Sequence, residues 1–229
     1  MPTDAEPVVV VEGDAASILQ ELADGAVDHV ITDPPYAEKT HAGARTGRRD
    51  RSLIDFESID DETFLVLCSE LVRVAKRWVV MTCDWRHSAA AECGGAPVIR
   101  CGVWVKPDAA PQFTGDRPGT GWEAVLMLHR PGRKKWNGGG HHAVWTHPVE
   151  RNNEHPTQKP LKLVRKWVRD FTDPGDLILD PFGGSGTTAV AAACEGRRCL
   201  VVERDPQYIP VIRRRVGHAV GTGLLAGIA

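Results

Sequence analysis

The chain of 229 residues lacks long apolar runs, closely paired cysteines and a signal peptide. Its apolar runs are short, and its first residues do not show the basic and then apolar order of a signal peptide. The six cysteines include no C-x-x-C pair and lie mostly in apolar segments, which is typical of reduced core thiols and does not indicate a zinc site. We therefore expect a soluble, cytoplasmic protein without a membrane anchor, a structural disulfide or a bound metal.

Alternating strand and helix patterns run through most of the chain. Apolar segments predict seven strands, at residues 8–11, 28–32, 77–83, 98–106, 122–129, 177–180 and 198–203. Helical patterns lie at residues 15–22, 61–75, 161–171, 187–194 and 206–216, the last with Pro206 in its first turn. This order predicts one α/β domain over residues 1–229, with a doubly wound, mostly parallel, seven-stranded sheet. No helix separates 98–106 from 122–129, so we expect an antiparallel hairpin at one edge.

The tetrapeptide Asp33-Pro34-Pro35-Tyr36 follows the second expected strand and suits chemistry on a flat base that carries an amine. Two consecutive prolines fix two φ angles and donate no N–H. The Asp33 carboxylate and the Pro34 carbonyl can together accept both hydrogens of an exocyclic amine, and Tyr36 offers a ring for stacking. The same four residues would also serve as a rigid turn at the end of a strand.

Residues 180–188 form a strand end, a glycine loop and a helix start. Glycines allow a tight turn, and the N–H groups at a helix start attract an anionic group. Gly184, Gly186 and Ala189 match the pattern G-x-G-x-x-A, and Glu203 ends the next strand, where a ribose-binding acid belongs. This spacing leaves NAD and other adenosine cofactors open. A P-loop is disfavoured, because no lysine follows the glycines.

A third segment, His-Pro-Thr-Gln-Lys-Pro at residues 155–160, precedes the helix expected at 161–171. Together and in this order, the three segments resemble those of the DNA methyltransferases that methylate exocyclic amino groups with S-adenosylmethionine. The catalytic motif precedes the glycine loop, which is similar to the β-type of that family. The resemblance spans residues 13–203 and implies a class I, Rossmann-like methyltransferase fold. It also implies a site-specific enzyme of the restriction-modification kind, with S-adenosylmethionine as cofactor and double-stranded DNA as partner.

The resemblance implies a role for each matching residue. The catalytic residues would be Asp33, Pro34, Pro35 and Tyr36. The cofactor would be bound by Asp14, Thr157, Lys159, Asp180, Phe182, Gly183, Gly184, Ser185, Gly186, Thr187 and Glu203. Among these, Thr157 and Lys159 match the segment that closes over the methionine end, and Glu203 matches the acid that takes the ribose hydroxyls. Asp14 matches an acid near the adenine edge, but it is equally a good N-cap for the helix at 15–22.

The target base follows from the same resemblance. Methyl transfer from a sulfonium needs no metal, since the leaving group departs neutral, but the amine nitrogen must be aimed at the methyl carbon. The base must be flipped out of the duplex to reach the site. In the family, Asp at the first motif position is more usual in adenine enzymes, so Asp33 favours the N6 amine of adenine. N4-cytosine or RNA adenine methylation, a non-catalytic nucleic-acid-binding module and an NAD oxidoreductase remain as alternatives.

The formal net charge is only −2, so any contact with nucleic acid must come from local basic patches. We expect such contacts, beside the catalytic motif, from Lys39, Arg45, Arg48, Arg49, Arg51, Lys134, Lys135 and Trp136. Each patch would otherwise be a solvated loop. Residues 106–153 are the inserted region that we expect to recognise the target. This region is short for the family, which favours either a short target sequence or a homodimer.

Overall fold

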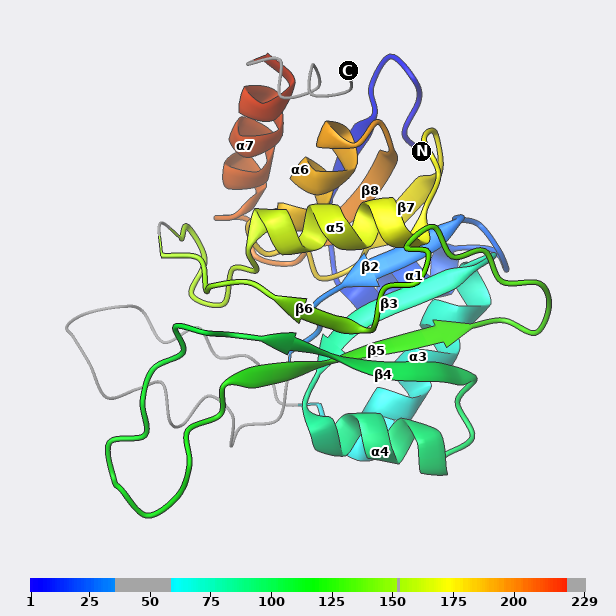
Figure 1. Cartoon of the computed structure of the whole chain (residues 1–229). Coiled ribbons are helices and arrows are strands. Elements are labelled where there is room, and N and C mark those ends of the chain that lie inside the picture. The colour runs from blue at the N-terminus through cyan, green and yellow to red at the C-terminus, as the bar shows by residue number, and fades with distance from the viewer. Residues whose placement is uncertain (36–58, 152, 222–229) are drawn as a thin grey trace.

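The computed structural model of the protein describes residues 1–35, 59–151 and 153–221, which place a mixed β-sheet between two layers of helices (Figure 1). The eight strands of this sheet lie in the order β1-β8-β7-β2-β3-β5-β4-β6. In chain order they are β1 (Val8–Glu12), β2 (His29–Thr32), β3 (Trp78–Cys83), β4 (Val98–Val105), β5 (Trp122–His129), β6 (Val144–Thr146), β7 (Leu177–Asp180) and β8 (Arg198–Glu203).

The strand directions confirm the predicted architecture. Strands β1, β8, β7, β2 and β3 are parallel, whereas β5 runs antiparallel to both of its neighbours, β3 and β4. All seven predicted strands are present, and the antiparallel hairpin is formed by β4 and β5. The hairpin is not at the edge as expected, because the additional strand β6 pairs with β4 in parallel. With three residues, β6 is too short for an alternating pattern to indicate it.

Helices cover both faces of the sheet (Figure 1). One face carries α1 (Ala15–Glu21), α3 (Asp61–Val74) and α4 (Trp85–Cys93), and the other carries α5 (Leu161–Phe171), α6 (Thr187–Cys194) and α7 (Ile209–Gly221). The sequence did not predict α4, in which only His87 and Ala91 are buried, so no apolar stripe marks it. Helix α7 begins at Ile209 rather than at residue 206, because Asp205 accepts the N–H groups of Gln207 and Tyr208 and forms a turn.

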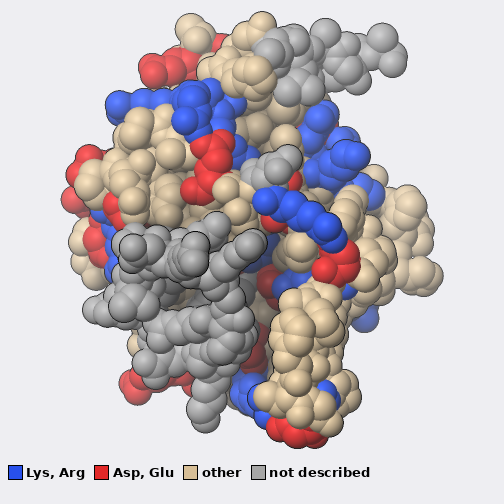
Figure 2. Space-filling model, turned by 90° about the vertical axis from the view of Figure 1, so that its left-hand side faces the viewer, with Lys and Arg blue, Asp and Glu red and all other residues tan. Residues whose placement is uncertain are grey.

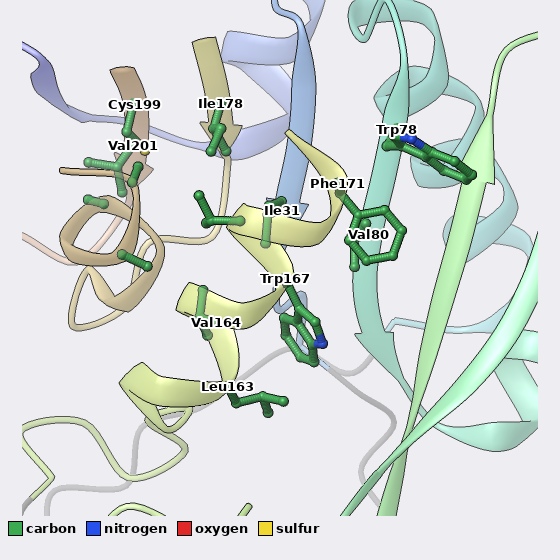
Figure 3. Close-up of a cluster of buried hydrophobic side chains, with 14 of the residues drawn as sticks. Ile31, Trp78, Val80, Leu163, Val164, Trp167, Phe171, Ile178, Cys199 and Val201 are labelled. Carbon is green, nitrogen blue, oxygen red and sulfur yellow. The ribbon is translucent and has the colours of Figure 1, made fainter. Parts of the chain in front are cut away.

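Helix α5 provides much of the core on its side of the sheet (Figure 3). Its buried residues Leu163, Val164, Trp167 and Phe171 recur every one, three or four positions, which places them on one helix face. They pack with the strand residues Ile31, Trp78, Val80, Ile178, Cys199 and Val201. Burying one large apolar side chain contributes roughly 1.5–3 kcal/mol. This packing fixes α5 against β2, β3, β7 and β8.

Aspartates cap three of the helices. Asp14 accepts the N–H of Ser17 at 3.1 Å, which confirms its predicted N-cap, and Asp60 and Asp84 cap α3 and α4 in the same way. Of the six cysteines, four are buried and two, Cys93 and Cys101, are exposed, and none is in a disulfide. Within the described residues, no helix is both long enough and apolar enough to cross a membrane.

Candidate active site

The carboxyl ends of the parallel strands surround a cavity of about 920 Å³. Ligands bind at this edge in doubly wound sheets, and the volume is in the range of small-molecule sites. Three segments that lie far apart in the chain line the cavity, at residues 33–35, 155–159 and 180–188, the last without Gly186. Figure 2 shows this side of the molecule, where acidic and basic side chains border a hollow. The structure therefore brings the three predicted motifs together.

The glycine loop after β7 is held in shape by its own backbone and by α7. Gly183 donates its N–H to a β8 carbonyl at 2.8 Å, and Gly186 donates to the Gly183 carbonyl at 2.7 Å. Gly184 and Gly186 have φ angles of 51° and 80°, which favour glycine. Nη1 of Arg215 donates to the carbonyl and the hydroxyl of Ser185 at 2.6 and 2.8 Å. Sequence reasoning did not find this arginine.

Two buried carboxyl groups line the cavity at the ends of β7 and β8. Asp180 is 3% exposed and accepts the Thr32 hydroxyl at 2.7 Å, and burial raises its pKa to about 6. Glu203 accepts the N–H groups of Gly184 and Asp205 at 2.6 and 2.8 Å, and burial raises its pKa as well. Both groups are desolvated, so a ligand that carries positive charge or hydroxyl groups would stabilise their ionised forms.

Lys159 contacts the first residue of the tetrapeptide that follows β2. Its Nζ donates to Oδ2 of Asp33 at 2.5 Å, and Oδ1 of the same carboxylate accepts the Thr82 hydroxyl. Lys159 is 8% exposed, and its Nζ also lies 3.4 Å from Oε2 of Glu123. Burial alone would lower the pKa of Lys159, but the two carboxylates raise it above its ordinary value. Lys159 is therefore protonated. It binds the Asp33 carboxylate, which we expected to accept the amine of a base.

The segment before α5 also faces the cavity. Thr157 donates its N–H to Nδ1 of His155 at 3.3 Å, and the His155 ring packs on Tyr208 with a centroid distance of 4.7 Å. Burial lowers the pKa of His155 to about 4, so this imidazole is neutral near pH 7. Asp14 lines the cavity and also caps α1, so the two roles expected for it, at the cofactor and as an N-cap, are compatible.

The remaining predicted residues fall into two groups. Tyr36 and the first basic patch, which contains Lys39, Arg45, Arg48, Arg49 and Arg51, lie outside the described residues. The second patch, Lys134 to Trp136, lies beyond the amino ends of the parallel strands, opposite the cavity. Strand β5 runs antiparallel and carries the residues that follow it away from the site. There Lys135 pairs with Asp173 at 2.6 Å, and Trp136 packs edge-on against Phe171. The expected position beside the catalytic motif is therefore wrong for Lys134, Lys135 and Trp136.

Sequence reasoning missed several cavity residues from β4 and β5. Glu123 accepts the ammonium of Lys106, and the ring of Trp104 lies 4.7 Å from Lys106 Nζ and 6.0 Å from Lys159 Nζ. Glu123 has a recognisable pattern, since it is the one carboxylate in the apolar strand Trp-Glu-Ala-Val-Leu-Met-Leu-His. A charged side chain in such a strand requires a polar partner.

Comparisons with known proteins agree with this geometry. The DNA methylase family matches residues 27–214. The protein YubD of Escherichia coli (strain K12), which is named as a methylase, is 30% identical over 213 residues, covering 86% of this chain and 85% of its own. The Type II methyltransferase M.HinfI of Haemophilus influenzae is 24% identical over 246 residues, covering 90% of this chain and 67% of its own.

Solved structures share the fold. The PvuII DNA methyltransferase (cytosine-N4-specific) has a TM-score of 0.71 at 16% identity, over 96% of this chain and 93% of its own. The M1.HpyAVI-SAM complex has a TM-score of 0.67 at 24% identity, over 91% of this chain and 99% of its own. These similarities confirm the expected class I methyltransferase fold.

Proposed function

The chain belongs to the DNA methylase family, and from this premise we propose that it transfers a methyl group from S-adenosylmethionine to the N6 amine of a flipped-out adenine in double-stranded DNA. The main support is the convergence of the three motifs on one cavity. Asp33 at the first motif position favours adenine over cytosine. The proposal includes recognition of a specific site, which residues 106–153 would read.

The cavity fits the cofactor. Asp180 is buried against a hydroxyl and a backbone N–H, and these neutral partners leave its charge uncompensated, so the ammonium of the methionine part would stabilise it. Glu203 at the end of β8 would take the ribose hydroxyls. Phe182 and the loop of Gly184 to Thr187 would wrap the methionine part. When bound, the sulfonium supplies an activated methyl group.

The chain's own residues must hold and aim the target amine. An exocyclic amine conjugated with a ring is a poor nucleophile, so its lone pair has to be directed at the methyl carbon. Asp33 and the Pro34 carbonyl would accept the two amine hydrogens and fix that direction. Pro35 keeps the turn rigid, and Tyr36 would stack on the flipped base. Held in this way, the amine would direct its lone pair at the methyl carbon of the sulfonium, and the proton that the nitrogen gives up would pass to the Asp33 carboxylate.

One experiment tests the whole assignment. A mixed library of duplex DNA is incubated with the protein and S-adenosylmethionine, and the product is sequenced with a readout that distinguishes modified adenine from modified cytosine. We expect N6-methyladenine in a short, defined context. Methylated cytosine would instead support the N4-cytosine alternative, which the similarity to the PvuII enzyme favours. Absence of any methylated base, with cofactor binding intact, would support the non-catalytic alternative.

Cofactor binding should depend on the protonation of Asp180. In the ligand-free protein its pKa is about 6, so below that pH a proton must leave before the carboxylate can hold the cofactor ammonium. We expect the Kd for S-adenosylmethionine to increase by about tenfold for each pH unit below about 6 and to level off above it. Calorimetric titration between about pH 5 and pH 7.5 measures this dependence.

The control is Asp180→Asn, which keeps the shape of the side chain and removes the titrating proton. The variant should bind the cofactor weakly, and its Kd should change little over the same pH range. A wild-type Kd that is constant down to pH 5 would contradict the role proposed for Asp180.

We propose that two loops of the region 106–153 recognise DNA. They are the loop between β4 and β5 and the loop that follows β6, and both lie on the cavity side. The loop between β4 and β5 projects from the sheet (Figure 1), and Asp108 at its base accepts the Val149 N–H at 2.9 Å and pairs with Arg151 at 3.2 Å. Phe113 in this loop is 82% exposed, and its ring would contact bases or sugars. The homodimer expected from the short region remains a prediction.

Phe113→Ala should weaken DNA binding. Loss of one aromatic contact to a base costs about 1–3 kcal/mol, so we expect the Kd for cognate duplex to increase by about 5- to 150-fold. Cofactor affinity should not change. Val66→Ala is the control, since Val66 is an apolar residue on α3 that is also largely exposed, at 60%. Equal DNA affinities for the wild type and Phe113→Ala would show that this ring does not contact DNA.

A further inference from the structure

We propose that Glu123 is a positioning residue for methyl transfer, whose carboxylate takes the Lys159 ammonium from Asp33 when the target amine arrives. This inference rests on the proposed function, because it concerns how Asp33 becomes available to a base. It assigns a role to a β5 residue that belongs to none of the three motifs. Glu123 belongs to a row of four charged side chains at the cavity.

The row runs Asp33, Lys159, Glu123, Lys106 and alternates in charge. Lys159 Nζ lies 2.5 Å from Asp33 Oδ2 and 3.4 Å from Glu123 Oε2, and Lys106 Nζ contacts Glu123 Oε1. The members come from four parts of the fold: the end of β2, the segment before α5, strand β5 and the end of β4. Two carboxylates and two ammonium groups thus form a neutral set, and all four residues line the cavity.

The contact between Lys159 and Asp33 competes with the proposed chemistry. An amine donor needs a carboxylate oxygen with available negative charge, and Lys159 binds one oxygen while the Thr82 hydroxyl binds the other. The ammonium cannot simply move into water, because Lys159 is only 8% exposed. A buried charge that loses its partner is strongly destabilising. Lys159 therefore needs a second carboxylate close at hand if it is to release Asp33.

Glu123 meets this need. Its Oε2 is buried and, within the described part of the chain, has no hydrogen-bond partner of good geometry, although Lys159 Nζ is only 3.4 Å away. The two groups already form an ion pair at this distance, and a small shift of Nζ would add a hydrogen bond of good geometry. The Trp104 ring, 6.0 Å from Lys159 Nζ, provides a π face on the same side. Lys159 can thus exchange one carboxylate for the other without becoming solvated.

Lys106 should weaken the attraction between Glu123 and Lys159. It binds Oε1 of Glu123, so it competes with Lys159 for the negative charge of that carboxylate. Its backbone N–H also donates to the Gly121 carbonyl at 2.7 Å, which closes the base of the loop that carries Phe113. Removing the Lys106 charge should strengthen the pull of Glu123 on Lys159. Removing the charge of Glu123 should therefore lower the rate of methyl transfer, and removing the charge of Lys106 should raise it.

The test is the single-turnover rate of methyl transfer to the cognate duplex, with saturating S-adenosylmethionine and DNA. We expect Glu123→Gln to lower this rate by about 10- to 100-fold, because the amine then meets an Asp33 that is still bound to Lys159. The Kd values for cofactor and DNA should remain near those of the wild type. Glu123→Asp, which restores the charge, should recover part of the rate, and Lys106→Gln should react faster than the wild type, because Glu123 then attracts Lys159 more strongly.

Glu195→Gln is the matched control. Glu195 is a buried glutamate remote from the cavity wall that pairs with Arg165 and Arg169 at 2.7 and 2.6 Å. Its substitution should lower stability without lowering the single-turnover rate. A wild-type rate for Glu123→Gln, or a loss in Lys106→Gln as large as that in Glu123→Gln, would overturn the inference. If Glu123→Gln does not fold, the Lys106→Gln rate decides, and a rate no higher than that of the wild type counts against it.

Failure of the proposed function has a different result. A wild-type protein that methylates no amine under any of these conditions would refute the function itself. An active wild type with an unaffected Glu123→Gln variant would refute only the role of Glu123.

Discussion

Asp33→Ala should lower methyl transfer by at least about a thousandfold while leaving S-adenosylmethionine binding nearly intact. The substitution removes the carboxylate proposed to accept one hydrogen of the target amine. It also leaves Lys159 with Glu123 as its one remaining carboxylate among the pairs described. Transfer of labelled methyl groups to duplex DNA measures the rate, and calorimetric titration measures cofactor binding.

Asp170→Ala is the control for this substitution. Asp170 is 4% exposed and pairs with Lys166 on α5, so its loss also breaks a buried carboxylate–lysine pair, but at a position outside the cavity wall. We expect this variant to be less stable and still active below its unfolding temperature. Asp33→Asn, which keeps one acceptor oxygen, should fall between the wild type and Asp33→Ala. Wild-type turnover in Asp33→Ala would refute the assignment of the catalytic turn.

Gly186→Ala should both destabilise the protein and weaken cofactor binding. Gly186 has a φ of 80°, and an added Cβ would lie 2.8 Å from Cγ2 of Ile212 on α7. The backbone conformation alone costs about 1–3 kcal/mol for a residue other than glycine. To relieve the clash, the loop or α7 must move, which displaces the loop residues proposed to contact the cofactor; a loss of about 2.8 kcal/mol of binding free energy corresponds to a hundredfold increase in Kd. We therefore expect the Kd for S-adenosylmethionine to increase by about a hundredfold.

The matched control for Gly186→Ala is Gly196→Ala. Gly196 has a similar φ of 70°, but an added Cβ would meet no atom within 4 Å. Urea unfolding of the two variants separates the cost of the backbone conformation, which they share, from the cost of the clash, which only Gly186→Ala has. If both variants lose the same stability and bind the cofactor equally well, the packing of α7 against the loop has no role in the site.

Much of the fold could be predicted because its elements carry strong local patterns. The apolar strands and the amphipathic face of α5 are visible in the sequence, and the alternation of strands and helices implies a parallel sheet. The short strand β6 was missed because it depends on pairing with β4, and α4 was missed because it lacks an apolar stripe. The start of α7 was placed three residues too early, because the hydrogen bonds that Asp205 accepts form a turn that the apolar pattern does not indicate.

The site was predictable where a motif follows a parallel strand. The carboxyl ends of β2 and β7 lie at one edge, so Asp33 and Asp180 had to be near each other. The contact between Lys159 and Asp33 could not be predicted, because it depends on the depth at which a loop residue is buried. The predicted position of Lys134 to Trp136 was wrong, because β5 runs antiparallel and the residues after it lie beyond the amino ends of the parallel strands, away from the cavity.

The direction of β5 has a further consequence for the loop that joins it to β4. Val105 at the end of β4 pairs with Trp122 at the start of β5, so both ends of the loop are fixed in the sheet at the cavity. Lys106 and Glu123 sit just beside these anchors, while Phe113 is far out between them. On the proposed role of this loop in DNA recognition, residues 107–120 should be exchangeable: we expect a loop grafted from another methylase to change the DNA sequence that is methylated, while Lys106 and Glu123 keep their places.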